Sequence, residues 1–287
     1  MKEAGMERFI DLHTHSLMSD GSMTPAEVVR EAKRAGLAAI ALSDHDSISG
    51  VKEAMAEGER IGVEVVPAIE FSVQSPTETH ILAYYLDIDN PVLLEELANA
   101  RKVRDRRNEE TARKLRDLGF DVTLEEALAI APNGIVGRAH FARLLMEKGY
   151  TESVKAGFKE YLENGKAAYC GEQYFTDEQC VRLIRQCGGL SFVAHLHLIK
   201  LDDDTLRQFL LRLKAAGLDG VEGYYTEYTP EMQEKYQRMA AELGLLISGG
   251  SDFHAKMKPH IAIGRGTGDL RIPYSVLETI KAHRRER

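Results

Sequence analysis

The stretch FIDLHTHSLMSDG, from Phe9 to Gly21, places two histidines and an aspartate directly after an apolar run. The run is typical of a buried strand, and side chains along a strand alternate between its two faces. His13 and His15 therefore point to the same side of the strand, and Asp20 follows them on the next loop. Imidazoles and a carboxylate that leave one strand end together indicate ligands of a metal cluster.

Further apolar segments that are typical of strands follow along the chain, with helical patterns between them. Thr24 and Pro25 begin the first predicted helix, Gly36 lies past its end, and a second helix is expected over Ser49–Ile61. The expected strands are Arg8–His13, Leu37–Asp44, Val63–Ser72, Glu78–Asp87, Leu190–His195, Asp219–Tyr225 and Leu245–Asp252. Repeated strand–helix units predict parallel strands with helices on the outside.

The pattern is helical from about Pro91 to Gly165, with no convincing strand. The four expected helices cover Leu93–Leu118, Thr123–Ile130, Arg138–Lys148 and Thr151–Asn164. We therefore predict an α/β barrel formed by residues 1–90 and 176–287, with a helical insertion over residues 91–175. The first of these helices carries eight basic and four acidic residues between Arg101 and Asp117. They form either a solvated, salt-bridged face or a surface that follows a nucleotide backbone.

Each expected strand carries a side chain that can bind a metal ion, at or near its end. The carboxyl ends of parallel barrel strands face one rim, where active sites lie. The candidate ligands are His13, His15, Asp20, His45, Glu70, His80, His195, Asp252 and His254. Asp44 and Glu222 are further carboxylates on these strands. Nine ligands are too many for one ion and suit three, with Glu70 and Asp252 as bridging carboxylates.

Several metal ions close together can polarise a phosphoryl oxygen and activate water, so phosphoester hydrolysis is the expected chemistry. The sequence contains no Walker-type phosphate loop, no Rossmann fingerprint and no G-x-S-x-G nucleophile elbow. The net charge of −8 argues against a general nucleic-acid binder, but it is compatible with a nucleotide substrate.

The bulk properties of the chain fit a globular protein. Its 287 residues can form one large domain, and 44% of them are hydrophobic. The sequence has no apolar run of membrane-spanning length and no signal-peptide pattern, so we expect a cytoplasmic protein without a membrane partner. No obligate protein partner is evident, and the three cysteines are expected to be reduced thiols.

The segments DLHTHSLMSDGSMTP, LSDHD, AIEFS, VAH and GGSDFH resemble the successive motifs of the polymerase and histidinol phosphatase (PHP) family of metal-dependent phosphoesterases. The resemblance covers nearly the whole chain and implies a distorted seven-stranded (βα) barrel with a trinuclear metal centre. All nine candidate ligands match the family's ligands in type. We expect three divalent ions, with Mn²⁺ favoured over Fe²⁺, Zn²⁺ and Mg²⁺, and catalytic roles for Asp20, Glu70, His195 and Asp252.

The segment GRAHFARLLMEKGY, residues Gly137–Tyr150, resembles a branch of that family that removes phosphate from nucleoside 3',5'-bisphosphates. Some members also trim short 5'-phosphorylated RNA. The resemblance implies that Arg138 and His140 face the substrate phosphate, although Ala139 replaces the usual proline. Lys258 either helps to hold phosphate or is a solvated lysine.

The sequence therefore predicts a metal-dependent phosphatase that acts on small nucleotides by attack of a metal-bound hydroxide. A nucleoside 3',5'-bisphosphate is the favoured substrate, and release of its 3'-phosphate would leave a 5'-nucleotide. The first alternative is a 5'-to-3' exoribonuclease acting on short 5'-phosphorylated RNA. A histidinol-phosphate phosphatase and a noncatalytic metal-binding module are the others, and the Arg-x-His insertion fits histidinol phosphate poorly.

Overall fold

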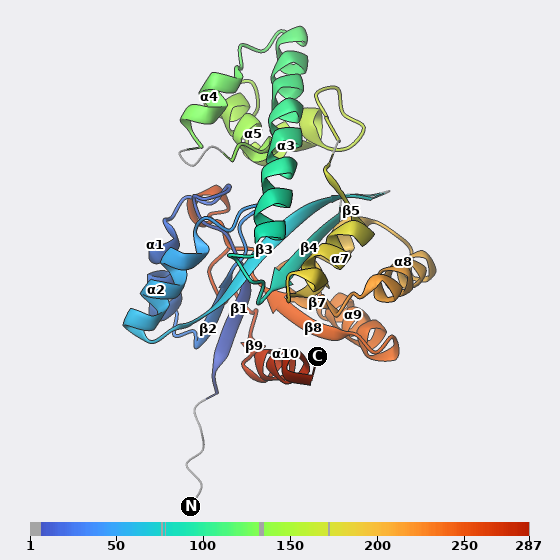
Figure 1. Ribbon diagram of the computed structural model, residues 1–287. Helices are drawn as coiled ribbons and strands as arrows, with labels where there is room; N and C mark the ends of the chain where they lie inside the picture. Colours follow the sequence, from blue (N-terminus) through green and yellow to red (C-terminus); the bar gives the residue numbers. More distant parts are fainter. Residues whose placement is uncertain (1–6, 76, 78, 132–134, 172, 287) are drawn as a thin grey trace, which may run out of the picture.

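A computed structural model describes residues 7–75, 77, 79–131, 135–171 and 173–286 of the chain. Within these residues, strands of one mixed sheet form the centre of the molecule (Figure 1). The strands are β1 (Phe9–Thr14), β2 (Ala39–Leu42), β3 (Glu64–Gln74), β4 (Thr79–Tyr84), β5 (Phe175–Thr176), β6 (Leu190–Val193), β7 (Gly220–Tyr225), β8 (Leu246–Gly250) and β9 (Ile272–Pro273). The two-residue strands β5 and β9 were not expected from the sequence.

The sheet curls into a nearly closed barrel with the strand order β8-β7-β6-β4-β3-β2-β1-β9, while β5 pairs with β3. Two backbone hydrogen bonds connect the segment after β8 to β1 and close the barrel: Asp252 N donates to His13 O and His15 N donates to Phe253 O, each at 2.9 Å. The seven expected strands correspond to β1–β4 and β6–β8. The predicted fold, a distorted seven-stranded barrel with a helical insertion, is therefore confirmed.

The expectation that these strands are all parallel is wrong for β4. β4 is antiparallel to both of its neighbours, with Glu70 opposite Leu82 on β3 and Leu82 opposite Phe192 on β6. Only residues 75–78 separate β3 from β4, and so short a connection can join only antiparallel neighbours. Because β4 runs in the reverse direction, His80 near its start lies at the same rim as Glu70.

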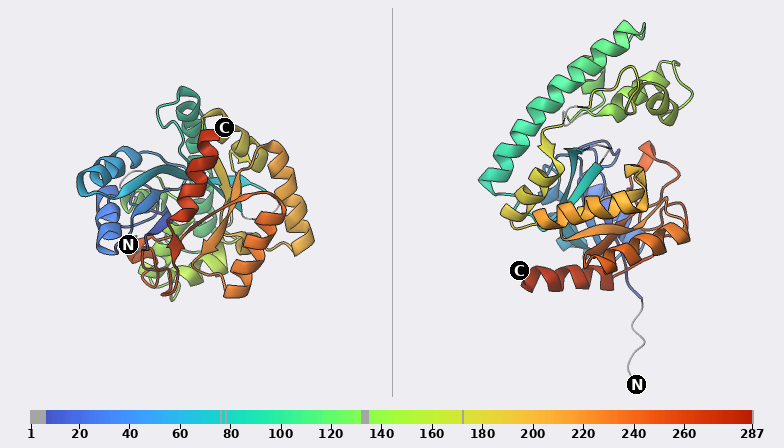
Figure 2. Two further views of the ribbon diagram at one scale, coloured as in Figure 1. Left: turned by 90° about the horizontal axis from the view of Figure 1, so that it is seen from below. Right: turned by 90° about the vertical axis from the view of Figure 1, so that its right-hand side faces the viewer.

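Helices cover the outside of the barrel and its lower end (Figures 1 and 2). They are α1 (Pro25–Arg34), α2 (Val51–Ile61), α7 (Asp177–Gln186), α8 (Asp203–Ala216), α9 (Pro230–Glu242) and α10 (Ser275–Glu286). Thr24 caps α1 as expected, since its side chain accepts a hydrogen bond from Glu27 N. No helix in the described part of the chain has an apolar segment long enough to cross a membrane.

Apolar side chains fill the barrel and close its lower end. Leu12, Val66, Leu82 and Phe192 pack together inside the barrel with Leu277 and Ile280 of α10. Burial of each such side chain contributes about 1.5–3 kcal/mol to folding. The opposite rim, beneath the insertion, is the end that remains open to a ligand.

The insertion lies above this open rim (Figure 1). Its elements are α3 (Pro91–Asp117), α4 (Leu124–Ala129), α5 (Arg138–Glu147), α6 (Val154–Gly157) and a π-helical turn, η1 (Phe158–Leu162). The helix expected over Thr151–Asn164 is thus divided into α6 and η1. The insertion has its own apolar cluster around Leu115, Phe141 and Leu145.

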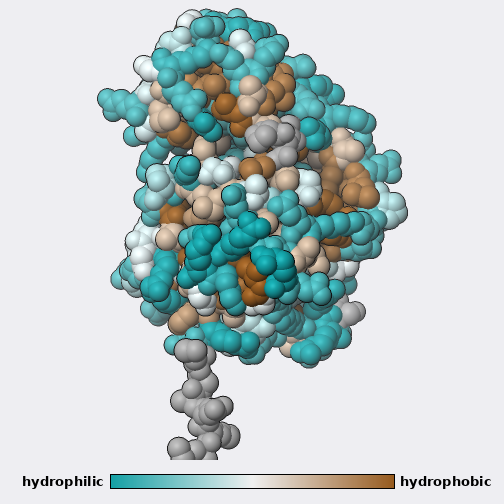
Figure 3. All heavy atoms as spheres, turned by 90° about the vertical axis from the view of Figure 1, so that its left-hand side faces the viewer, coloured by the Kyte–Doolittle hydropathy of each residue, from teal (hydrophilic) through white to brown (hydrophobic). Residues whose placement is uncertain are grey.

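The small core of the insertion leaves part of its apolar surface uncovered. Figure 3 shows hydrophobic residues gathered over the upper part of one face of the molecule. Leu118, Leu128 and Tyr150 of the insertion are 44%, 45% and 38% exposed. A small bundle buries a smaller fraction of its surface than a large domain, which accounts for this exposure.

Gly250 allows β8 to approach β1 at the position where the barrel closes. An added Cβ would lie 2.2 Å from the Cβ of His13 and 2.4 Å from its backbone nitrogen, so the strands would have to separate. We expect Gly250→Ala to lower the free energy of unfolding by about 3 kcal/mol, as measured by urea denaturation. Gly36→Ala is the control, because its φ of +76° adds backbone strain but no atom lies within 4 Å of the added Cβ. Equal losses in the two variants would contradict the steric explanation.

Candidate metal centre and substrate cleft

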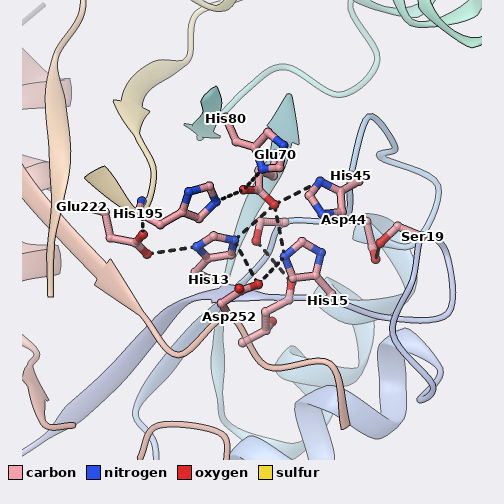
Figure 4. A network of polar contacts seen from close by, with 12 residues as sticks. His13, His15, Ser19, Asp44, His45, Glu70, His80, His195, Glu222 and Asp252 are labelled. Carbon is pink, nitrogen blue, oxygen red and sulfur yellow. Dashed lines mark hydrogen bonds and ion pairs between the residues drawn. The ribbon is translucent and has the colours of Figure 1, made fainter. Parts of the chain in front are cut away.

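The open rim of the barrel gathers histidines and carboxylates from most of its strands (Figure 4). The structure brings together all nine residues that were predicted as metal ligands: His13, His15, Asp20, His45, Glu70, His80, His195, Asp252 and His254. They come from positions spread over more than 240 residues of the sequence. The fold of the barrel, rather than any local segment, therefore assembles this cluster.

Glu70 lies at the centre of the cluster. Its Oε1 is 2.9 Å from His80 Nδ1 and 3.0 Å from His195 Nε2. Its Oε2 lies 3.1–3.3 Å from a ring nitrogen of each of three more histidines, His13, His15 and His45. A single carboxylate thus reaches five imidazoles, as a bridge between adjacent cations would.

Two aspartates complete the cluster on the other side of His15. Asp252 Oδ1 lies 3.3 Å from His15 Nε2 and 3.3 Å from His254 Nδ1. Asp20 Oδ1 lies 3.1 Å from His254 Nε2. The second oxygen of Asp252 accepts hydrogen bonds from Tyr225 Oη at 2.9 Å and Lys258 Nζ at 2.5 Å. Lys258 is therefore not a freely solvated lysine.

The electrostatics of the cluster favour ionised carboxylates. Burial opposes ionisation of Glu70, but the surrounding histidines, led by His45 and His13, hold its pKa well below the usual range. Burial likewise opposes ionisation of Asp252, whereas Lys258 and His254 lower its pKa. Ionised carboxylates are the form in which these residues could hold a cation.

Several atoms of the cluster are buried without a hydrogen-bond partner among the described residues. They are Nε2 of His13, both ring nitrogens of His15, Nδ1 of His45, Nδ1 of His195 and Oε2 of Glu70. Buried polar atoms are nearly always paired, so this many unpaired atoms in one place need an explanation. Three groups, His15/Asp20/His45/His254, His13/His15/Glu70 and His45/Glu70/His80, each have potential ligand atoms within 4.8 Å of one another. Donors of this kind fit divalent transition metals.

Two residues of the cluster have left-handed backbone conformations. His195 has φ of +29° just after β6, and Asp252 has φ of +57° just after β8. Such conformations cost roughly 1–3 kcal/mol for a residue other than glycine, and they are concentrated at functional sites. The sheet therefore ends in strained turns where these two side chains enter the cluster.

The cluster forms the floor of a cleft of about 460 Å³ between the barrel rim and the insertion. This volume lies in the range of small-molecule sites. The cations along the cleft are Arg104, Arg107, Arg138, Lys155 and Lys258. Its apolar lining includes Val154, Phe158, Met257 and Ile261. The cleft can therefore accept a molecule with both anionic and flat apolar parts.

A family comparison agrees with this geometry, since the PHP domain family matches residues 11–247. The chain belongs to the PHP family. It is 33% identical over 248 residues to a 3',5'-nucleoside bisphosphate phosphatase of Chromobacterium violaceum, covering 86% of this chain and 87% of that protein. It is 32% identical over 268 residues to the 5'-3' exoribonuclease Rnm of Escherichia coli, covering 92% and 91%.

The solved structures agree with the family assignment. A metal-dependent phosphoesterase from Bifidobacterium adolescentis superimposes with a TM-score of 0.85 at 28% identity, covering 96% of both chains. The present chain is accordingly a metal-dependent phosphoesterase, a hydrolase of phosphoric ester bonds, as its motifs predicted. The alternative of a noncatalytic module is not supported.

Arg138 and His140, the two residues of the Arg-x-His segment, differ in their position relative to the cleft. Arg138 is the first residue of α5 and lines the cleft, where its guanidinium also lies 5.5 Å from the ring centre of Tyr169. His140 is not among the described residues that line the cleft. Its Nδ1 accepts a hydrogen bond from Gly137 N at 3.1 Å, and burial lowers its pKa. The neutral ring then carries its proton on Nε2.

The basic helix α3 does not present a uniformly solvated face. Arg104 and Arg107 are only 9% and 5% exposed and line the cleft. Arg104 forms an ion pair with Asp46, and Arg107 Nη1 donates to Gln173 Oε1 at 2.9 Å. The solvated-face interpretation is therefore wrong for these two arginines.

Sequence reasoning placed Asp44 and Glu222 on the expected strands but gave neither a role, and in the structure both carboxylates support the cluster from behind. Asp44 accepts hydrogen bonds from Ser16 N at 2.8 Å and from Ser19 Oγ at 2.6 Å, which fixes the loop that carries Asp20. Glu222, expected at a strand end, lies within β7 and contacts His13. Their place next to histidine-bearing strand ends was visible in the sequence, but their partners were not.

Proposed function

We propose that this PHP phosphoesterase removes the 3'-phosphate from nucleoside 3',5'-bisphosphates and leaves a 5'-nucleotide. The cleft is the observation that carries the proposal, because it joins the histidine and carboxylate cluster to several cations and an apolar wall. In a bisphosphonucleotide, one phosphate can bind at the cluster, the second phosphate can bind the cations, and the base can pack against the apolar wall. The relative from Chromobacterium violaceum named for this activity supports the choice.

The nine clustered residues are proposed to hold three divalent metal ions, with Mn²⁺ favoured. The three groups of converging ligand atoms support this number, and Glu70 and Asp252 have the contacts of bridging ligands. Bound divalent ions would supply Lewis-acid stabilisation of phosphate charge and make water a better nucleophile. Asp20, Glu70, His195 and Asp252 are the proposed catalytic residues, since they place charge and ring nitrogens around the reacting phosphate.

Arg138 and Lys258, which line the cleft, and His140, which does not, are proposed to hold phosphate oxygens. Arg138 lines the cleft from the insertion and can offer two parallel N–H donors to a phosphate. Lys258, fixed by Asp252, contributes a cation at the cluster itself. His140 would donate from Nε2, because its Nδ1 already accepts from Gly137 N.

A 5'-to-3' exoribonuclease acting on short 5'-phosphorylated RNA is the second candidate. A polar hollow of about 570 Å³ shares His80, Arg138 and Gln173 with the cleft and could receive further nucleotides. The relative from Escherichia coli carries that name. RNA binding would weaken with salt, with a slope of about −0.7 for each phosphate contacted, whereas a mononucleotide would respond little.

One panel of substrates separates these functions. We expect phosphate release with Mn²⁺ to show a kcat/KM for adenosine 3',5'-bisphosphate about tenfold or more above that for 3'-AMP, which lacks the 5'-phosphate, because a second charged contact contributes about 1.5–3 kcal/mol. AMP, the expected product, should release little phosphate. Histidinol phosphate should be a poor substrate. Equal or faster turnover of a short 5'-phosphorylated RNA would instead favour the exoribonuclease.

We also propose that the enzyme works in the cytoplasm on small nucleotides, without an obligate protein partner. Its cysteines, Cys170, Cys180 and Cys187, are free thiols, and burial raises the pKa of Cys180 well above the usual value. Unpaired thiols are typical of a reducing compartment.

A further inference from the structure

Glu222 is a buried carboxylate that directly contacts two of the proposed metal ligands. It lies within β7, is fully buried, and is not among the described residues that line the cleft. Its Oε1 is 3.0 Å from His13 Nδ1, and its Oε2 accepts a hydrogen bond from His195 N at 2.7 Å (Figure 4). One side chain therefore links strands β1, β6 and β7 behind the cluster.

The contact with His13 determines which ring nitrogen of that histidine can bind a metal. An ionised carboxylate only accepts hydrogen bonds, so the Nδ1 of His13 must carry the proton in this pair. In the neutral ring, which is the form that binds a metal, the lone pair is then on Nε2, which lies 3.3 Å from Glu70 Oε2. That Nε2 is also one of the buried atoms without a hydrogen-bond partner among the described residues.

The contact with His195 holds a strained backbone. His195 has φ of +29° and ψ of 61°, where the chain turns sharply after β6. The hydrogen bond to Glu222 Oε2 satisfies the amide at that turn. The next amide, Leu196 N, donates to Tyr228 Oη at 2.8 Å, and the same hydroxyl donates to the carbonyl oxygen of Glu222 at 3.2 Å. Residues around β7 thus fix the backbone that carries the His195 ring.

We propose that Glu222 is a positioning residue that makes His13 and His195 competent metal ligands. The inference rests on the proposed metal-binding roles of these histidines. Carboxylates that accept a proton-bearing nitrogen from a ligating histidine fix the ring and strengthen its binding to the metal. Glu222 does this for His13, and it holds the backbone of His195 with its second oxygen.

Replacement by glutamine tests the proposal sharply. Glutamine has the same shape but only one acceptor oxygen, while Glu222 must accept from both His13 and His195. If the amide group faces His13, its ring must turn its lone pair towards the amide and its proton towards the metal. If the amide group faces His195 N, two donors face each other.

We expect Glu222→Gln to bind Mn²⁺ about 10- to 100-fold more weakly than the wild type, measured as metal retained during dialysis against buffered Mn²⁺. The concentration of Mn²⁺ needed for half-maximal activity should rise by the same factor, while KM for the nucleotide stays unchanged. Glu57→Gln is the matched control, since Glu57 is 8% exposed but pairs with Arg30 and Arg60 on the outer helices. Unchanged Mn²⁺ affinity in a folded Glu222→Gln protein would overturn the proposal.

A second measurement needs no variant. In the wild-type protein loaded with Zn²⁺, ¹⁵N NMR of the histidine rings should find His13 protonated at Nδ1 and metal-bound at Nε2. The opposite arrangement would overturn the role of Glu222 while leaving the proposed phosphatase function intact. A wild-type protein that takes up no divalent metal would overturn both this inference and the proposed function.

Discussion

Glu70→Gln is expected to reduce phosphate release by about 10³-fold or more while the barrel remains folded. Glu70 has both oxygens within 3.3 Å of imidazole nitrogens, and five histidines meet at this one carboxylate. An amide removes the negative charge and turns an NH₂ group towards at least two of these rings. The loss of metal stabilisation, about 4 kcal/mol or more, corresponds to that reduction.

The measurement combines turnover with metal content and thermal unfolding. Glu70→Gln should retain less metal than the wild type and unfold at a similar temperature in the presence of a chelator. Glu64→Gln provides the control on the same strand, because Glu64 begins β3 at the opposite end and pairs with Lys281 and Tyr274. Normal activity in Glu70→Gln would exclude a bridging role for this residue.

Arg138→Met should lower kcat/KM for a nucleoside 3',5'-bisphosphate by roughly 10- to 100-fold. Methionine keeps much of the length of the side chain but removes the guanidinium, and a hydrogen bond to a charged group contributes about 1.5–3 kcal/mol. If Arg138 binds the reacting 3'-phosphate, 3'-AMP and the bisphosphate should lose activity alike. A loss confined to the bisphosphate would assign Arg138 to the second phosphate.

Arg143→Met is the matched control for this variant. Arg143 lies on the same helix, α5, but its Nε donates to Glu147 at 2.7 Å on the exposed side. Arg143→Met should therefore leave kcat/KM for the nucleoside 3',5'-bisphosphate unchanged. An Arg138→Met enzyme that equals the Arg143→Met enzyme would remove Arg138 from the substrate site.

The barrel could be predicted because its strands are strongly apolar and its helices have clear start signals such as Thr24. The direction of β4 was harder to predict from the sequence, since a strand of alternating residues has the same pattern whichever way it runs. The short connection after β3 was the available signal. The strands β5 and β9 were not predictable, because two residues pair only where the rest of the fold brings them together.

The cluster could be predicted from residue types at strand ends, but its supports could not. The backbone conformations of His195 and Asp252 are set by tertiary contacts, and no sequence pattern marks a left-handed histidine or aspartate. Arg104 lies in a helix with charges on every side, so its burial depends on the barrel residue Asp46. Glu222 is one acidic residue within a strand, and its partners lie 27 and 209 positions away.

The closure of β8 against β1 also sets the order in which this enzyme can mature during synthesis. His13 emerges from the ribosome about 240 residues before Gly250 and Asp252, which contact it. Contacts between such distant positions form slowly, and domains fold as units once their chain is available. A nascent chain that ends before Gly250 should therefore have neither a closed barrel nor a complete set of the proposed ligands, and so no premature phosphatase activity.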